Sequence, residues 1–156
     1  MSEILAIDPG TEQSGWVRLY GARVLESGVS PNEDLLARVC TLSGYVRAGL
    51  VSAMLAVERF EARGMPIGDD SIRTILWTGR FVQAWRPQDA VMVKRSAIKV
   101  HLCGTAKAKD PNVRQALIDR LGAPGTKKAP GPTYGVTSHA WAALAVAVAA
   151  ADGVRC

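Results

Sequence analysis

The stretch Ile4-Leu-Ala-Ile-Asp-Pro-Gly-Thr-Glu-Gln-Ser-Gly-Trp16 decides how this chain begins its fold. The apolar run over 2–7 predicts a short buried strand that ends just before Asp8. Gly10 and Gly15 flank a small polar loop and predict a tight turn into a second strand. A carboxylate at the mouth of a buried strand can hold a metal, brace a phosphate loop or start a turn. Asp8 is therefore the first candidate functional residue.

The remainder of the sequence continues with strand patterns and then alternates helix and strand patterns. Strands are predicted over 15–20, 22–28, 53–57 and 90–93, and helices over 34–50, 71–85, 110–121 and 138–151. Loops rich in Gly and Pro are predicted over 61–70 and about 122–135, and we expect the second loop to be mobile. This order predicts an α/β fold, a mixed sheet flanked by helices, with residues 1–156 forming a single domain.

The composition is that of an ordinary globular chain, with 48% hydrophobic and 21% charged residues among 156. The apolar segment 140–151 is too short to span a bilayer, and no targeting segment opens the chain, so we expect an intracellular protein. The three cysteines, Cys40, Cys103 and Cys156, are dispersed. Their spacing favours reduced thiols over a disulfide framework or a zinc site.

Positive charge is concentrated in one part of the chain. Residues 91–130 carry nine Lys and Arg against two Asp, a net charge of +7, whereas residues 1–90 carry −2. A basic block of this kind is typical of a surface that binds a polyanion, most often nucleic acid.

Asp8 and Glu58 share one property, because each directly follows an apolar strand. If the two strands are parallel neighbours, both carboxylates emerge at the same edge of the sheet, where ligands collect in such folds. Two carboxylates this close repel each other unless a proton or a cation intervenes. Their oxygen atoms suit Mg²⁺, with Mn²⁺ as a substitute, and we expect two such ions, which can activate water for phosphodiester cleavage.

Three short motifs together resemble the RuvC family of Holliday-junction resolvases, and the compactness of the chain is similar to the bacteriophage branch. These are Ile7-Asp8-Pro9-Gly10-Thr11 with Ser14-Gly15, then Val57-Glu58, and then Ser138-His139-Ala140 before Leu144-Ala145-Val146-Ala147. The resemblance implies an RNase H-like fold, a homodimer, and Mg²⁺-dependent hydrolysis of DNA at four-way junctions. It implies that Asp8 and Glu58 are metal ligands, and it places the protein in the cytoplasm of a bacterium or of a phage-infected host.

The last helix departs from that family. The family commonly has an acidic residue or His at the helix start and an Asp three residues later. His139 occupies the first position, but Ala142 occupies the second and cannot bind a metal. Asp110 is the candidate substitute ligand in the basic block, although an Asp before Pro is also a good start for a helix. The predicted catalytic and metal-binding set is therefore Asp8, Glu58, His139 and Asp110.

DNA-binding residues are predicted in the strand and loop before the 110–121 helix, where basic side chains can contact phosphates. The predicted set is Lys94, Arg95, Lys99, Lys107, Lys109 and Arg114. Met65, in the loop after Glu58, is a candidate wedge for the centre of a junction.

Three other functions stay open at this point. The chain can be a junction-binding protein that does not cleave, which Ala142 favours. It can be a nuclease for other branched DNA or for structured RNA. It can also be an actin-like ATPase that uses 8–15 as a phosphate loop, but such proteins are much longer and need a second phosphate loop.

Overall fold

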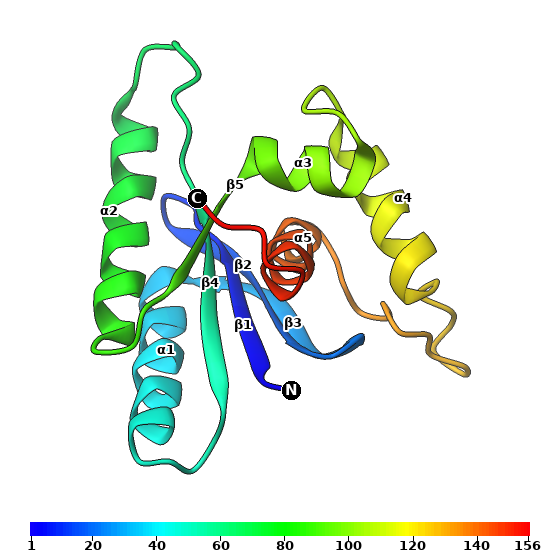
Figure 1. The fold of residues 1–156 in the computed structure, drawn as a ribbon, viewed down its shortest axis with the longest axis horizontal. Helices are drawn as coiled ribbons and strands as arrows, with labels where there is room; N and C mark the ends of the chain where they lie inside the picture. Colours follow the sequence, from blue (N-terminus) through cyan, green and yellow to red (C-terminus); the bar gives the residue numbers. More distant parts are fainter.

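The computed structural model describes residues 1–156 as a five-stranded mixed sheet with helices on both faces (Figure 1). Strands β1 (Glu3–Asp8), β2 (Gln13–Tyr20) and β3 (Arg23–Pro31) form an antiparallel meander. Strands β4 (Ala53–Arg59) and β5 (Val91–Lys94) then join parallel to β1, so the order across the sheet is β3-β2-β1-β4-β5. The predicted α/β architecture is confirmed.

The helices divide into two layers. On one face lie α1 (Asn32–Arg47) and α2 (Asp69–Trp85), and on the other lie α3 (Arg95–Cys103), α4 (Asp110–Leu121) and α5 (Ala140–Ala151). Figure 1 shows α5 nearly end-on beside the strands, with α1 and α2 on the far side of the sheet. No helix combines the length and the apolar character needed to cross a membrane.

The apolar strands are buried on both faces, as their continuous runs predict. In β1, Leu5 and Ile7 belong to the core cluster beneath α1 and α2, whereas Ile4 and Ala6 belong to the cluster beneath α5. Because side chains alternate along a strand, the next residue on the α5 side after Ala6 is Asp8. The same alternation places Glu58 on the side of Ala56, so both carboxylates face the layer that contains α5.

Helix α5 lies in the centre of its layer, against β1, β2, β4 and β5. Ten of its twelve residues are buried, and only Ala142 and Ala151 are not. Its many alanines let the helix axis approach the sheet closely. Ala142 faces away from the core, toward a cleft that Glu58 and Asp110 also line.

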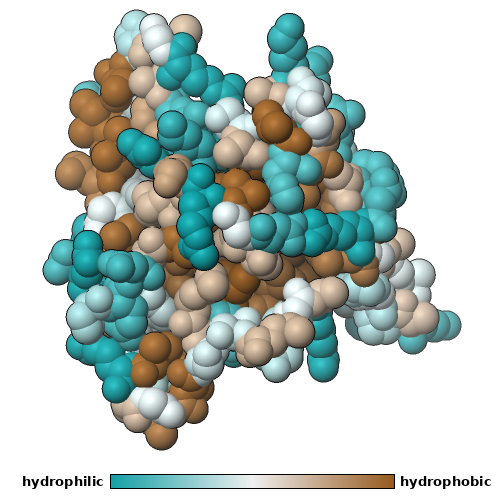
Figure 2. Space-filling model, in the orientation of Figure 1, coloured by the Kyte–Doolittle hydropathy of each residue, from teal (hydrophilic) through white to brown (hydrophobic).

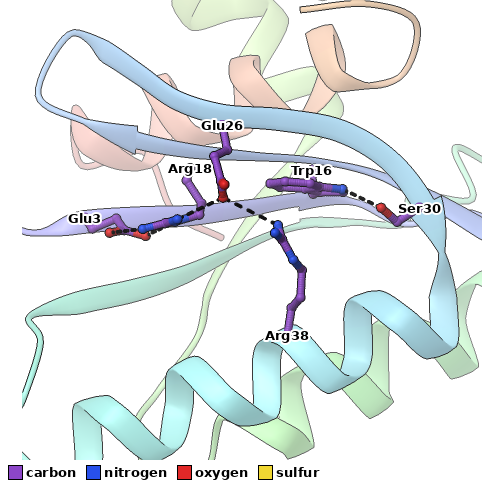
Figure 3. A network of polar contacts seen from close by, with 6 residues as sticks. All are labelled: Glu3, Trp16, Arg18, Glu26, Ser30 and Arg38. Carbon is purple, nitrogen blue, oxygen red and sulfur yellow. Dashed lines mark hydrogen bonds and ion pairs between the residues drawn. The ribbon is translucent and has the colours of Figure 1, made fainter.

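A polar network ties the first three strands to α1 on the opposite face of the sheet (Figure 3). Arg18 donates hydrogen bonds from Nε and an Nη atom to the Glu3 carboxylate, at 2.5 and 2.9 Å, and a third to Glu26 at 2.8 Å. Arg38 of α1 lies over the Trp16 ring and approaches Glu26 at 3.6 Å. The charges in this network are paired with one another, and the network lies on the side of the sheet away from Asp8.

The structure corrects the prediction that a loop carries the basic residues between 95 and 103, because this segment is helix α3. Ile98 and Leu102 are spaced by one helical turn and pack toward the α5 core, and Gly104 ends the helix with φ of +77°. A single apolar turn within a basic stretch gave too weak a pattern to predict a helix. Helix α2 also begins at Asp69, so Asp69 and Asp70 lie in its first turn and not in the preceding loop.

Candidate active site

The two carboxylates predicted to meet do so at the carboxyl ends of β1 and β4. These strands are parallel and paired through Ile7 and Val57, so Asp8 and Glu58 are the next residues along neighbouring strands. The two carboxylates were predicted to meet only if these strands were parallel neighbours, and the structure confirms that they are. Both side chains are largely removed from water, and Asp8 is only 8% exposed as a residue.

The proximity of the two acids changes their protonation. Burial raises the pKa of Asp8 above its ordinary value, against the attraction of Arg95 and His139. Burial and the charge of Asp8 together raise the pKa of Glu58 from 4.5 to about 7, although Arg95 opposes this. Burial is the largest cause of both shifts, because removal of water destabilises an ionised carboxylate, and for Glu58 the negative charge of Asp8 adds to the effect of burial. A cation between the two groups would relieve that repulsion.

His139 approaches the carboxylates from the other side. It directly precedes α5, and its Nδ1 atom lies 3.3 Å from Oδ2 of Asp8. Gly15, paired with Asp8 in the sheet, makes this approach possible. A Cβ atom on Gly15 would collide with the carbonyl and the Cβ of His139. Gly15 therefore lies within β2, as the strand predicted over 15–20 requires, and its missing side chain permits the close packing.

The loop after Asp8 is held by buried polar side chains. Ser14 Oγ accepts a hydrogen bond from the Gly10 amide at 3.1 Å and donates one to Asn32 Oδ1 at 2.6 Å. Asn32 Nδ2 in turn donates to the Gly10 carbonyl at 3.0 Å. Sequence reasoning missed Asn32, because only the packing of α1 against the meander brings it to the loop. The network fixes the backbone beside Asp8.

Arg95 contacts the acidic pair directly, although the sequence suggested only a role in binding DNA. Its Nε atom lies 3.2 Å from Oε1 of Glu58. Burial lowers the pKa of Arg95, but the nearby charges of Glu58, Asp8 and Asp110 raise it overall, so Arg95 carries its positive charge here.

Asp110 and Ala142 line the same cleft. Its volume is about 260 Å³, and Glu58, Arg95 and His139 also contribute to its walls. Asp110 is the first residue of α4, and its charge acts on both Glu58 and Arg95. The structure thus brings Glu58, His139 and Asp110 to one cleft, and Asp8 adjoins it through its contact with His139. Ala142 presents a methyl group where a longer side chain would point into the cleft.

Most of the predicted DNA-binding residues gather beside these acids. Arg95, Lys99, Lys107 and Lys109 line a hollow of about 550 Å³ that also includes Arg63 and Asp110. Arg114 lies in the neighbouring cleft, with its guanidinium 4.8 Å from the centre of the Trp141 ring.

Lys94 and Met65 lie apart from both the hollow and the cleft. Lys94 ends β5, where it pairs with Arg59. Met65 is 70% exposed in the loop between β4 and α2.

The donors around Asp8 suit a hard divalent cation, because they are carboxylate oxygens and an imidazole. Burial of Glu58 beside the charge of Asp8 raises its pKa, and a cation between the two acids would offset both effects. However, no group of three or more His, Cys, Asp or Glu side chains is already arranged to hold a metal. The geometry therefore fits an ion bound mainly by Asp8 and Glu58, with His139 adjacent.

Comparison with solved structures identifies the architecture. Over 98% of both chains, the structure of Thermus thermophilus RuvC superposes with a TM-score of 0.62 at 22% identity. The chain has the fold of RuvC. The structure of T. thermophilus RuvC in complex with a Holliday junction substrate matches with a TM-score of 0.63 at 23% identity, over 97% of this chain and 93% of that one. No family model and no curated protein matches the sequence.

The RuvC fold confirms the RNase H-like architecture that the three motifs implied. It also accounts for the order of the site residues along the chain. Asp8 is the last residue of β1, Glu58 is the next-to-last residue of the parallel strand β4, and His139 directly precedes α5.

Proposed function

We propose that this protein is a metal-dependent endonuclease that cleaves four-way DNA junctions or related branched DNA. The observation that carries the proposal is the convergence of Asp8, Glu58 and His139 at one sheet edge beside a basic hollow, on a RuvC fold. One of the solved structures with this fold is described as bound to a Holliday junction substrate.

Each group has a distinct part in the proposed reaction. Asp8 and Glu58 would hold Mg²⁺ or Mn²⁺, which supplies an activated water and stabilises the negative charge that develops on the phosphate. His139 orients Asp8 through its Nδ1 atom. Lys107 and Lys109 bind neighbouring phosphates and position the strand without selecting a sequence.

A homodimer is part of the proposal, since a four-way junction offers two equivalent strands. Helix α2 exposes apolar side chains at helical spacing, Ile72, Ile75 and Leu76, and Met65 and Ile67 precede them. Figure 2 shows hydrophobic side chains over the part of the surface where α2 lies in Figure 1. We assign this apolar face of α2 to contact with a second copy of the chain.

The test is cleavage of a synthetic four-way junction against a linear duplex of the same sequence, in Mg²⁺ and in Mn²⁺. We expect selective cleavage of the junction and a loss of at least about a thousandfold in Asp8→Asn and in Glu58→Gln. Asp89→Asn, an exposed acid that pairs with Arg86 away from the site, is the matched control and should cleave normally. Cleavage that survives both site variants would contradict the proposal.

Ala142 favours one second candidate, a protein that binds junctions without cutting them. Tight and selective binding with no cleavage in either metal would support that function. Preference for flaps, forks or structured RNA in the same assay would instead change the substrate and leave the chemistry in place.

A further inference from the structure

The connection between β5 and α3 places Arg95 beside the carboxylate of Glu58. β5 pairs in parallel with β4, and Arg59 lies opposite Lys94, so α3 starts at the edge of the sheet where Glu58 emerges. Arg95 is the first residue of that helix. Its side chain lines both clefts around the acids as well as the basic hollow.

A second contact holds the start of α3 in place. The Glu61 carboxylate accepts hydrogen bonds from the Ser96 amide at 3.1 Å and from the Ser96 hydroxyl at 2.6 Å. Burial raises the pKa of Glu61, but the bonds from Ser96 and the charge of Arg63 outweigh it and lower that pKa overall. Glu58 and Glu61 thus secure two consecutive residues of α3, and Arg95 is positioned by the backbone as well as by its own ion pair.

The charges around Arg95 suggest its role. Asp8, Glu58 and Asp110 all attract its guanidinium, and together they carry three negative charges when ionised. One divalent ion and Arg95 supply three positive charges, whereas two divalent ions and Arg95 would supply five. The side of Glu58 that faces α3 is already occupied by Nε of Arg95, and Ala142 adds no carboxylate to the cleft.

We infer that Arg95 takes the place of a second divalent cation, so that this centre binds one metal ion per chain. The inference rests on the proposed function, because it concerns the same metal site. A guanidinium has five N–H donors and only Nε is used on Glu58, so its remaining donors are available to a phosphodiester oxygen of the substrate. Arg95 would then neutralise the acids and bind the phosphate with a single fixed charge.

The test is a Mn²⁺ titration of the metal-free protein without DNA, in which calorimetry and the paramagnetic signal of free Mn²⁺ give the stoichiometry. We expect one ion per chain in the wild type and in Arg95→Lys, which keeps the charge. In Arg95→Gln we expect a second ion to bind, or the first to bind roughly tenfold more tightly, because a repelling charge has gone. Arg86→Gln, which removes an exposed arginine elsewhere, should behave as the wild type.

Thermal unfolding in EDTA supplies a second measurement. Arg95→Gln should lower the melting temperature at pH 8, where the acids are ionised, and Mn²⁺ should restore it. Three results would each overturn the inference. These are two ions bound to the wild type, no ion bound to it, and a Mn²⁺ titration of folded Arg95→Gln that does not differ from that of the wild type. The inference stays open to refutation even if Arg95→Gln fails to fold, because two ions bound to the wild type would overturn it. Failure of the proposed function is distinguishable, because it would appear as absent cleavage with the metal stoichiometry unchanged.

Discussion

The Nδ1 atom of His139 lies 3.3 Å from Oδ2 of Asp8, although 131 positions separate the two residues along the chain. The contact exists because α5 begins directly over β2, where Gly15 lies opposite Asp8. The absence of a side chain at one strand position therefore decides whether the imidazole reaches the acidic pair.

Substitution of Gly15 by Ala should displace His139 from Asp8. The added methyl group would overlap the backbone of His139, and relief of such a clash in a packed region costs about 1–3 kcal/mol. We expect a lower melting temperature and at least about a tenfold slower cleavage of a four-way junction. Chemical denaturation and a single-turnover cleavage assay measure the two effects.

Gly44→Ala is the matched control for Gly15→Ala. Gly44 lies within α1, and a Cβ atom there meets no atom within 4 Å. Because Ala is a better helix former than Gly, this variant should be more stable by roughly 0.5–1 kcal/mol and should cleave normally. Equal stability losses in both variants would contradict the packing role of Gly15.

Introduction of a carboxylate by Ala142→Asp is the most informative change in the last helix. Ala142 is one of two residues of α5 that are not buried, and it lines the cleft with Glu58 and Asp110. If Arg95 and the existing acids suffice, the cleavage rate should change by no more than about fivefold. A large gain from an inactive wild type would instead show that the natural site lacks a ligand. Junction cleavage in Mg²⁺ and Mn²⁺ measures the effect.

The raised pKa of Glu58 predicts how stability depends on pH without metal. An acid whose pKa rises on folding, here from 4.5 to about 7, binds its proton more tightly in the folded state. The stabilisation from this proton is complete below about pH 4.5. As the pH rises through 7 the proton dissociates, and the free energy of unfolding falls by about 3 kcal/mol. Thermal unfolding in EDTA from pH 4.5 to 8 should therefore show a decline that Glu58→Gln reduces and Mn²⁺ reverses at pH 8.

The proposed dimer predicts a specific effect of Leu76→Glu. Leu76 is 63% exposed on the apolar face of α2, so a charge there should disrupt association without disturbing the core. Analytical ultracentrifugation should show a dimer for the wild type and a monomer for the variant. Leu50→Glu, at a residue that is 70% exposed beyond the end of α1, should remain dimeric. A monomeric wild type at micromolar concentration would exclude this interface.

The sequence predicted the acidic pair because the signal was local. A continuous apolar run ends on Asp8, a second ends on Glu58, and strands buried on both faces have this pattern. Parallel pairing of β1 and β4 then brings the two residues together, as expected. Helix α3 was missed because its only local signal was one apolar turn, Ile98 and Leu102, within a segment dominated by basic residues.

Other features had no local signal. In the sequence, Asn32 is typical of a residue at the start of a helix. Its hydrogen bonds to Ser14 and to the Gly10 carbonyl depend on how α1 packs against strands β1 to β3. In the sequence, Glu61 is one of several charged residues in a predicted polar loop, and nothing there indicates that its carboxylate accepts two hydrogen bonds from Ser96 at the start of α3.

The amino-acid sequence by itself determined the order of the strands and of every helix except α3, together with the apolar faces, the two carboxylates and the basic block. These features follow from residue type and spacing. Only the tertiary structure decided that Gly15 admits His139 to Asp8 and that Arg95 neutralises Glu58. These relationships join residues far apart in the chain, and they depend on distances of a few ångströms between packed elements. Spacing along one strand or helix cannot encode such distances.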